Sequence, residues 1–211
     1  MKVESFSIGS KYYSNEDRLL VKDLGSLGAV AVMADGMGGL SLGEVAAEAV
    51  TRSVSDYLAN NYHGNDEQSA LHKSLEFADQ ELRKLCIEKR SNMGAAIAVA
   101  IVTERKISYT WQGNVRIYLS RDGVATMLTH DHIADVGYGR TALVRCIKGA
   151  GLRSGLPSYE RKLQKGDIIF MCSDGLYSTA ETLLGHASME EMKEVIGMPD
   201  DDASLISLTI R

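Results

Sequence analysis

The stretch VMADGMGGLSLGEVAAEAV, residues 32–50, joins an apolar strand to an amphipathic helix through a glycine-rich turn. Asp35 closes the apolar run, and three glycines follow it within four residues. Glycine permits backbone angles and close approaches that a side chain forbids. Beyond the turn, apolar residues recur at three- and four-residue steps, which is typical of a helix that packs on one face. These residues are Leu42, Val45, Ala46, Ala49, Val50 and Val54. The stretch therefore predicts a strand, a sharp turn bearing a carboxylate, and a helix.

The glycines do not match a nucleotide-binding loop. A Walker loop needs a lysine, and this stretch has none. Ser41 stands where the third glycine of a dinucleotide-binding fingerprint belongs. We expect Ser41 instead to cap the helix that carries Glu44. We expect Gly36, Gly38 and Gly39 to permit the backbone angles and close approaches that the turn needs.

Length and composition predict one globular domain spanning residues 1–211, since the chain is 45% hydrophobic and 24% charged. A formal net charge of −5 argues against a nucleic-acid-binding protein. The first 13 residues lack the pattern of a signal peptide, and the longest apolar run, residues 94–102, is too short to cross a membrane. Three cysteines are isolated from one another, which favours free thiols in a reducing compartment. We therefore expect a cytoplasmic protein with no nucleic-acid or membrane partner.

The remaining periodicity predicts a sheet-rich fold. Strand candidates include residues 4–13 and 166–175, and several candidates are apolar at nearly every position, so both of their faces should be covered. Short turns such as Arg121-Asp122-Gly123 favour antiparallel hairpins over helical crossovers. Further helices are predicted over 71–85, 179–184 and 188–196. We expect an α+β fold, a four-layer α-β-β-α sandwich of two antiparallel sheets packed face to face with helices outside.

A few carboxylates lie at the ends of apolar strands, where a sheet core normally excludes charge. They belong to four segments spread over the chain and are Glu16, Asp17, Asp35, Asp174, Asp201 and Asp202. Burying an anion is costly unless it is paired or binds a metal. Oxygen ligands select hard ions such as Mg²⁺ or Mn²⁺, and two such ions can activate a water and orient a phosphate. A dinuclear hydrolase site is therefore our hypothesis.

An ordered set of motifs resembles the metal-dependent serine/threonine protein phosphatases of type 2C, over essentially the whole chain. The motifs are SNEDR (14–18), ADGMGG (34–39), GNVRIYLSRDG (113–123), LTHDH (128–132), GD (166–167), CSDGL (172–176) and DDASLI (201–206). The resemblance implies a double β-sandwich with helices outside, in agreement with the fold expected from the residues alone. It also implies hydrolysis of phosphoserine or phosphothreonine on a protein by a water that two Mn²⁺ or Mg²⁺ ions activate.

The resemblance assigns roles to individual residues. Asp35 would bridge the two metals, and the carbonyl of Gly36 would bind one of them. Asp174 and Asp201 would hold the first metal, and Glu16 would serve the second. Asp17, Asp35 and Asp174 form the implied catalytic set, with Asp17 orienting a metal-bound water. His130 and His132 resemble a metal-binding pair, but in the family pattern they belong to the scaffold near the flap.

The chain departs from the family pattern at the expected phosphate-binding position. The family usually has an arginine three residues before the asparagine of NED, and Tyr12 occupies that position here. Lys11 is adjacent. In a regular strand neighbouring side chains point to opposite faces, so Lys11 replaces the arginine only if a bulge shifts the register. Lys11 and Tyr12 are the substrate-binding residues that the sequence predicts.

Three other departures affect the site. Asn114 replaces the aspartate that serves a third metal in bacterial members, so we expect no third metal. The helical flap is reduced to a short stretch around 133–141, and Asp202 stands where the family has asparagine, which adds a negative charge.

The sequence supports two functions. The first is a small bacterial protein phosphatase of a signalling or sigma-factor circuit, similar in size to the stage II sporulation E group. The alternative, suggested by Tyr12 and Asn114, is a catalytically weak or inactive module that binds a phosphoprotein partner. Retention of Glu16, Asp35, Asp174 and Asp201 favours catalysis, because without metals these carboxylates would destabilise the fold.

Overall fold

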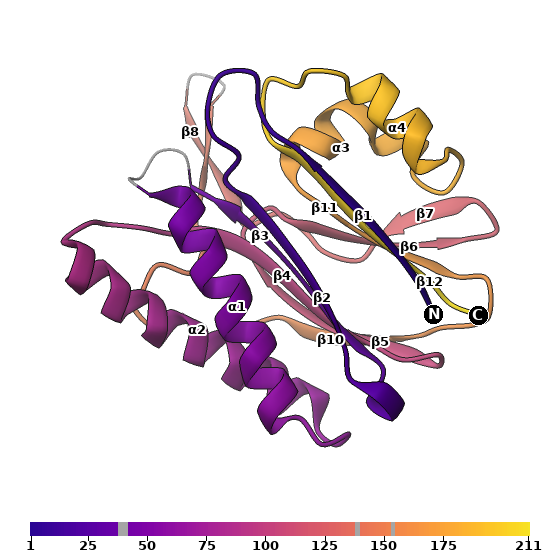
Figure 1. The fold of residues 1–211 in the computed structure, drawn as a ribbon, viewed down its shortest axis with the longest axis horizontal. Helices are drawn as coiled ribbons and strands as arrows, with labels where there is room; N and C mark the ends of the chain where they lie inside the picture. Colours follow the sequence, from indigo (N-terminus) through magenta and orange to yellow (C-terminus); the bar gives the residue numbers. More distant parts are fainter. Residues whose placement is uncertain (38–41, 138–139, 153–154) are drawn as a thin grey trace.

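Two five-stranded antiparallel sheets form the centre of the computed structural model, which describes residues 1–37, 42–137, 140–152 and 155–211 (Figure 1). The first sheet has the strand order β1 (Lys2–Ile8), β12 (Ala203–Thr209), β11 (Ile168–Cys172), β6 (Arg116–Arg121) and β7 (Val124–Met127). The second has the order β10 (Ser158–Lys162), β5 (Lys106–Gln112), β4 (Ala95–Val102), β3 (Ala29–Gly36) and β2 (Asp17–Asp23). Because β1 pairs with β12, the two chain ends lie side by side.

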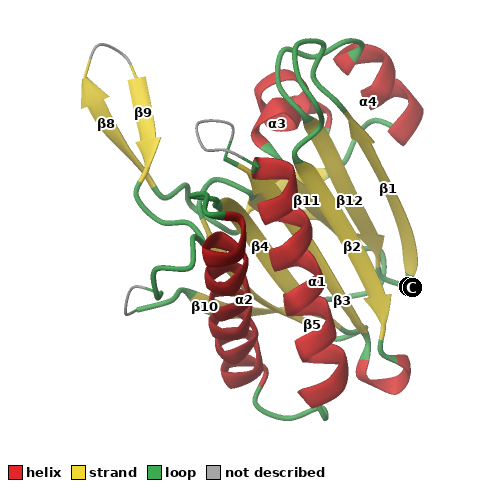
Figure 2. Ribbon diagram, turned by 60° about the vertical axis from the view of Figure 1, so that its left-hand side comes forward, coloured by secondary structure: helices red, strands yellow, loops and turns green. Residues whose placement is uncertain are grey.

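Helices cover the outer faces of both sheets. The helices α1 (Gly43–Asn61) and α2 (Glu67–Lys89) lie on the second sheet, and Figure 2 shows them side by side across it. The shorter helices α3 (Asp174–Ala180) and α4 (Met189–Ile196) lie on the first sheet. Single 3₁₀ turns occupy Gly25–Leu27 and Glu181–Leu183. The predicted four-layer sandwich is confirmed. Among the described helices, none combines the length and apolar character that a membrane crossing needs.

The period-two pattern of strand β3 decides which way its terminal carboxylate faces. Val30, Val32 and Ala34 pack against α1 and α2, whereas Ala31 and Met33 pack between the two sheets. Side chains two residues apart lie on the same face of a strand. Asp35 therefore continues the series that faces the opposite sheet. The fully buried positions of β3 explain why its sequence is almost continuously apolar.

Several element boundaries differ from the predicted ones. The first strand ends at Ile8, not at residue 13, because contacts with residues 199–202 hold residues 10–16 outside the sheet. The helix predicted over 179–184 begins earlier, at Asp174, directly after β11. The stretch expected to hold a reduced flap forms a hairpin of β8 (Ile133–Gly137) and β9 (Arg140–Leu143), which projects from the body in Figure 2. The predicted cap Ser41, with Gly38 and Gly39, lies outside the described residues.

Candidate active site

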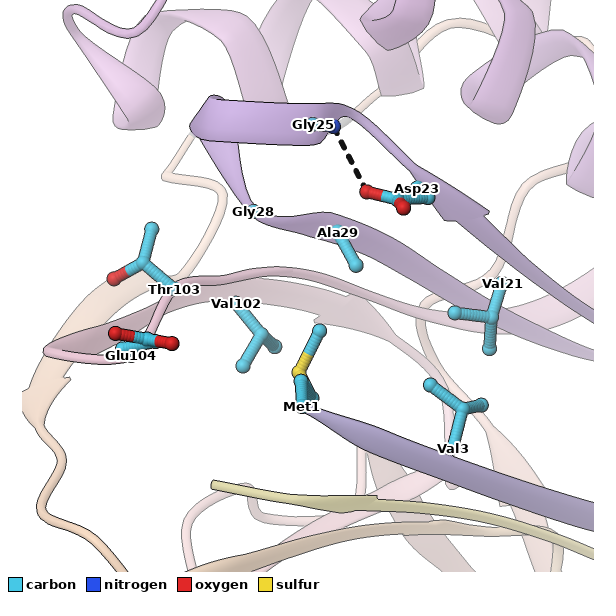
Figure 3. A pocket seen from close by; sticks show the side chains of 10 residues that line it. All are labelled: Met1, Val3, Val21, Asp23, Gly25, Gly28, Ala29, Val102, Thr103 and Glu104. Carbon is cyan, nitrogen blue, oxygen red and sulfur yellow. Dashed lines mark hydrogen bonds between the residues drawn. The ribbon is translucent and has the colours of Figure 1, made fainter. Parts of the chain in front are cut away.

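Two cavities lie at opposite ends of strands β2 and β3. The larger, of about 430 Å³, has mainly apolar walls that include Met1, Val21 and Val102 (Figure 3). The Asp23 carboxylate beside it accepts a hydrogen bond from the Gly25 amide at 2.8 Å. The other cavity, of about 320 Å³, carries nearly all of the predicted site. We therefore take the smaller, polar cavity as the candidate active site and call it the acidic pocket.

The acidic pocket gathers carboxylates from segments far apart in the sequence. Five line it, together with neutral side chains and the backbone of Gly36. The full lining comprises Tyr13, Glu16, Asp35, Gly36, Met37, Asn114, Ile133, Thr141, Leu143, Asp174, Asp201 and Asp202. All five predicted metal-binding residues are among them. Asp17 lies directly behind this wall and is only 3% exposed.

The second sheet contributes one side of the pocket. Asp17 and Asp35 are directly paired across β2 and β3, and the Gly36 amide donates to the Glu16 carbonyl at 3.2 Å. A Cβ added to Gly43, the first residue of α1, would lie 2.7 Å from the Glu16 carboxylate. A Cβ on Gly36 would lie 2.4 Å from the Gly43 carbonyl oxygen. These two glycines are therefore required because helix α1 begins in contact with the carboxylate wall.

The first sheet contributes the opposite side. The Ser173 hydroxyl donates to the Asp202 carbonyl at 3.1 Å and accepts from the Ser204 amide at 2.9 Å, which joins the end of β11 to the start of β12. This junction brings Asp174 beside the 201–202 segment. The Asn114 amide nitrogen donates to Asp174 Oδ2 at 2.9 Å. Asn114 therefore orients the Asp174 carboxylate, a role that sequence reasoning missed because it considered only the aspartate that Asn114 replaces.

The predicted substrate-binding pair does not reach the pocket wall. Residues 9–16 form a loop, so the strand alternation used to relate Lys11 to Tyr12 does not apply. The Lys11 ammonium instead pairs with Asp200 Oδ1 at 2.6 Å, and Tyr12 is 69% exposed. The residue of this segment that lines the pocket is Tyr13, whose hydroxyl donates to Asp201 Oδ1. A tyrosine in an irregular loop gives no sequence signal for such a contact.

Burial and mutual repulsion raise the proton affinity of the carboxylates. Burial raises the pKa of Asp17 to about 7; the charges of Asp202 and Asp174 add to this, while the nearby Ser173 and Ser204 hydroxyls oppose it. Burial likewise raises the pKa of Asp35 well above its ordinary value, with the charges of Asp17, Asp174 and Asp201 raising it further. The pKa of Asp174 rises for the same reasons. The cluster is thus electrostatically unfavourable as a set of bare anions.

The residues present fit divalent metal ions by their chemistry. Every side-chain donor in the proposed ligand set is a carboxylate oxygen, which suits Mg²⁺ or Mn²⁺. Neither oxygen of Asp17 makes a hydrogen bond of standard geometry, nor does Oδ1 of Asn114, although all three are buried. Cations would neutralise the wall and satisfy buried oxygens. Within the described part of the chain, no group of three or more His, Cys, Asp or Glu side chains has the arrangement needed to hold one metal ion.

The two flap-side histidines pack in the scaffold. His132 stacks on Trp111 with 5.5 Å between ring centroids, and His130 meets the same ring edge-on at 5.0 Å. The Gly113 amide donates to Nδ1 of His132 at 3.2 Å. Burial lowers the pKa of His132 to about 4, so it is neutral at physiological pH. Neither histidine lines the acidic pocket.

A family model described as protein phosphatase 2C matches residues 10–205. The chain belongs to the protein phosphatase 2C family. Members of this family are hydrolytic enzymes that use two metal ions. The acidic pocket lies at the motifs by which the sequence resembles that family.

Relatives and solved structures agree with this membership. A serine/threonine phosphatase stp of Listeria innocua is 24% identical over 200 residues, covering 85% of this chain and 77% of the relative. The serine/threonine protein phosphatase PstP of Mycobacterium tuberculosis is 26% identical over 209 residues, covering 87% of this chain but only 40% of the relative. A solved catalytic domain of a PstP phosphatase, in complex with two manganese ions, shares the fold at a TM-score of 0.77, with 23% identity and coverage of 98% and 96% of the two chains.

Replacing Gly175 should disturb the joint between α3 and the 201–202 segment. A Cβ there would lie 2.4 Å from the Asp202 carbonyl oxygen and 2.8 Å from that of Asp201. We expect Gly175→Ala to lower the free energy of unfolding by about 1–3 kcal/mol, as overpacking does, measured by urea denaturation. The control Ser178→Ala, at an exposed position of the same helix, should change it by less than about 0.5 kcal/mol. Equal stability of the two variants would contradict the crowding.

The metal-free protein should become more stable as pH falls from about 8 to about 6. Raised carboxyl pKa values mean that the folded state binds protons more tightly, so stability is lost as pH rises through a folded-state value such as that of Asp17, about 7. The lowered pKa of His132, about 4, acts in the opposite direction, but it is one group against the raised pKa values of three carboxyls. Melting temperatures recorded with chelator should show this slope.

Saturating Mn²⁺ should flatten the slope and add roughly 2.7 kcal/mol at one hundred times its Kd. Asp35→Asn should stabilise the metal-free protein at high pH and lose most of the Mn²⁺ gain. Chelated wild-type protein that melts earlier at about pH 6 than at about pH 8 would refute the repulsion on which both expectations rest.

Proposed function

We propose that this chain is a serine/threonine protein phosphatase that hydrolyses phosphoserine and phosphothreonine on a protein substrate. The observation that carries the proposal is the acidic pocket, where five carboxylates from separate segments face one cavity in a chain of the protein phosphatase 2C family. Two Mn²⁺ or Mg²⁺ ions bound there would supply an activated water for attack on phosphorus. Residues 1–211 form a single phosphatase domain in this proposal.

The roles of individual residues follow from their positions in the wall. Glu16, Asp35, Asp174 and Asp201, with the Gly36 carbonyl, would hold the metals. Asn114 restrains Asp174 through the hydrogen bond to its Oδ2, and Asp17 lies behind Asp35 on the paired strand. Such restraint of ligands is a common requirement of metal sites.

In this proposal, bound metals would supply the positive charge that a substrate phosphate needs in this pocket. A phosphate monoester carries up to two negative charges and would face five carboxylates. No lysine, arginine or histidine lines the described wall, so no described side chain there offers a positive charge to the phosphate. The neutral donors that remain include the Thr141 hydroxyl and the second N–H of the Asn114 amide, because the Tyr13 hydroxyl already donates to Asp201. The substrate phosphate would therefore depend on the metals for its charge complement.

The proposed setting is a bacterial cytoplasm, in a signalling or sigma-factor circuit of phosphorylated proteins. The relatives described above are Stp and PstP phosphatases of bacteria. The narrower resemblance to the stage II sporulation E group stays a prediction from size and the short flap.

A second function is a catalytically weak module that binds a phosphoprotein. It is favoured by one specific observation, that the position of the family arginine holds Tyr12 and that Lys11 is paired with Asp200 outside the pocket. If the wall holds phosphate too weakly for turnover, the same pocket would serve recognition alone.

Hydrolysis separates the two functions. We expect wild-type protein with Mn²⁺ to hydrolyse p-nitrophenyl phosphate and a phosphothreonine peptide, and chelator to abolish both. Asp174→Asn should lower kcat by more than about 100-fold, since even groups that only support metal ligands contribute about 10- to 100-fold. The control Asp56→Asn changes a 65% exposed carboxylate on α1, remote from the pocket, and should retain full activity. Mn²⁺ binding without turnover of either substrate would favour the binding module.

A further inference from the structure

Two segments from opposite ends of the chain are joined beside the acidic pocket. We call residues 10–16 and 199–202 the terminal clasp. The Lys11 amide donates to the Pro199 carbonyl at 3.2 Å, and the Ser10 hydroxyl donates to the Asp200 carbonyl at 2.9 Å. The clasp also contains two residues of the proposed metal site, Glu16 and Asp201. How the clasp is held therefore bears directly on where these two carboxylates lie.

The central contact of the clasp is the carboxylate of Asp202. Its Oδ1 accepts the Ser10 amide at 2.7 Å, and its Oδ2 accepts the Glu16 amide at 2.7 Å. The residue is only 5% exposed. An asparagine has one acceptor oxygen, and its NH₂ group would face a second N–H donor. This geometry requires aspartate, and it explains the departure from the asparagine expected at this position.

Asp202 acts on Glu16 through the main chain. The peptide on the amino side of Glu16 donates to Asp202, while the Glu16 carbonyl accepts the Gly36 amide at 3.2 Å. The backbone of Glu16 is thus fixed between Asp202, directly before β12, and Gly36, at the end of β3. The direction in which the Glu16 side chain enters the pocket depends on this double attachment.

Tyr13 does the corresponding work for Asp201. Oδ1 of Asp201 accepts the Tyr13 hydroxyl and also the Asp202 amide, the latter at 2.9 Å. Two donors on the same oxygen fix the carboxylate plane and leave Oδ2 available. Tyr13 reaches this oxygen only because the clasp holds its loop against residues 200–202.

We propose that Asp202 and Tyr13 are positioning residues, which set the orientation of Glu16 and Asp201 for metal binding without being ligands themselves. The proposal rests on the proposed function only in taking Glu16 and Asp201 as metal ligands. Both oxygens of Asp202 are already engaged by backbone amides, so its contribution is the geometry of the clasp in addition to its charge.

The decisive experiment compares Asp202→Asn with Asp200→Asn. Both remove one negative charge from the same loop, but Asp200 has an 80% exposed side chain that touches no amide of the clasp. Mn²⁺ affinity is measured by isothermal titration calorimetry on protein stripped of metal with chelator. We expect Asp202→Asn to weaken Mn²⁺ binding by roughly 10-fold or more, in the range of residues that support metal ligands. Asp200→Asn should change it by less than about 2-fold, as exposed charges do.

Two further readouts separate positioning from charge and from general destabilisation. In the metal-free protein, hydrogen exchange of the Ser10 and Glu16 amides should accelerate in Asp202→Asn and not in Asp200→Asn. The deficit in Mn²⁺ affinity should persist at high ionic strength, which screens a purely Coulombic loss. Wild-type Mn²⁺ affinity in Asp202→Asn, or a deficit that salt reduces to the level of Asp200→Asn, would overturn the proposal for Asp202.

Tyr13→Phe provides a test that does not depend on Asp202→Asn folding. The variant keeps the ring and removes only the donor to Asp201, so we expect a several-fold weaker Mn²⁺ affinity with an unchanged free energy of unfolding in the metal-free state. Unchanged Mn²⁺ affinity would overturn the proposal for Tyr13. Phosphothreonine hydrolysis is recorded alongside. Wild-type protein that binds Mn²⁺ without turnover would defeat the proposed function alone, whereas variants that bind Mn²⁺ normally would defeat this inference whatever the activity.

Discussion

The repulsion among carboxylates at one end of the sandwich is the constraint that the rest of the structure accommodates. Asp17 and Asp35 face each other across β2 and β3, and Asp174 and Asp201 approach them from the other sheet. Carboxylates this close are stable only with cations or protons between them. The long apolar strands behind them supply the burial that holds these charges together, because the free energy of core packing must exceed their repulsion. Because these carboxylates are buried, a cation that binds in the pocket would stabilise the fold more than a cation at an exposed site.

The pocket lies at the seam between the two sheets. Asp35 follows the inward-facing residues Ala31 and Met33 of the second sheet, while Asp174 and Asp202 flank β11 and β12 of the first. The sheets themselves are held apart by side chains such as Met33, Trp111 and Met171. The distance between the two halves of the site is therefore set by core residues that do not line the pocket. Because the core is closely packed, a change in the volume of these side chains would change that distance.

The fold and most of the site could be predicted because they depend on local and strongly patterned signals. Continuous apolar runs, short turns and a helical period each lie within a single segment of the sequence. Asp35 likewise marks the end of its own strand, whatever the other segments contain. Contacts that depend on a distant partner could not be predicted. Residues 10–13 were predicted to belong to the first strand, yet the amides of Ser10 and Glu16 pair with a carboxylate 192 and 186 positions away. Asn114 is similar, since its bond to Asp174 spans 60 positions and is invisible in sequence spacing.

Contacts between distant segments also explain how two departures from the family pattern, Tyr12 in place of arginine and Asp202 in place of asparagine, are related. In this chain the backbone of the loop is held by the Asp202 carboxylate, which accepts the amides of Ser10 and Glu16. With its two amide contacts in place, residues 10–13 turn so that Tyr13 faces Asp201 while Lys11 and Tyr12 face away from the pocket. The aspartate at 202, the tyrosine at 13 and the lack of an arginine at 12 are therefore linked features of one loop arrangement. In that arrangement the side chains of the terminal clasp hold the proposed metal ligands, and binding of the phosphate is left to the metals and the neutral donors.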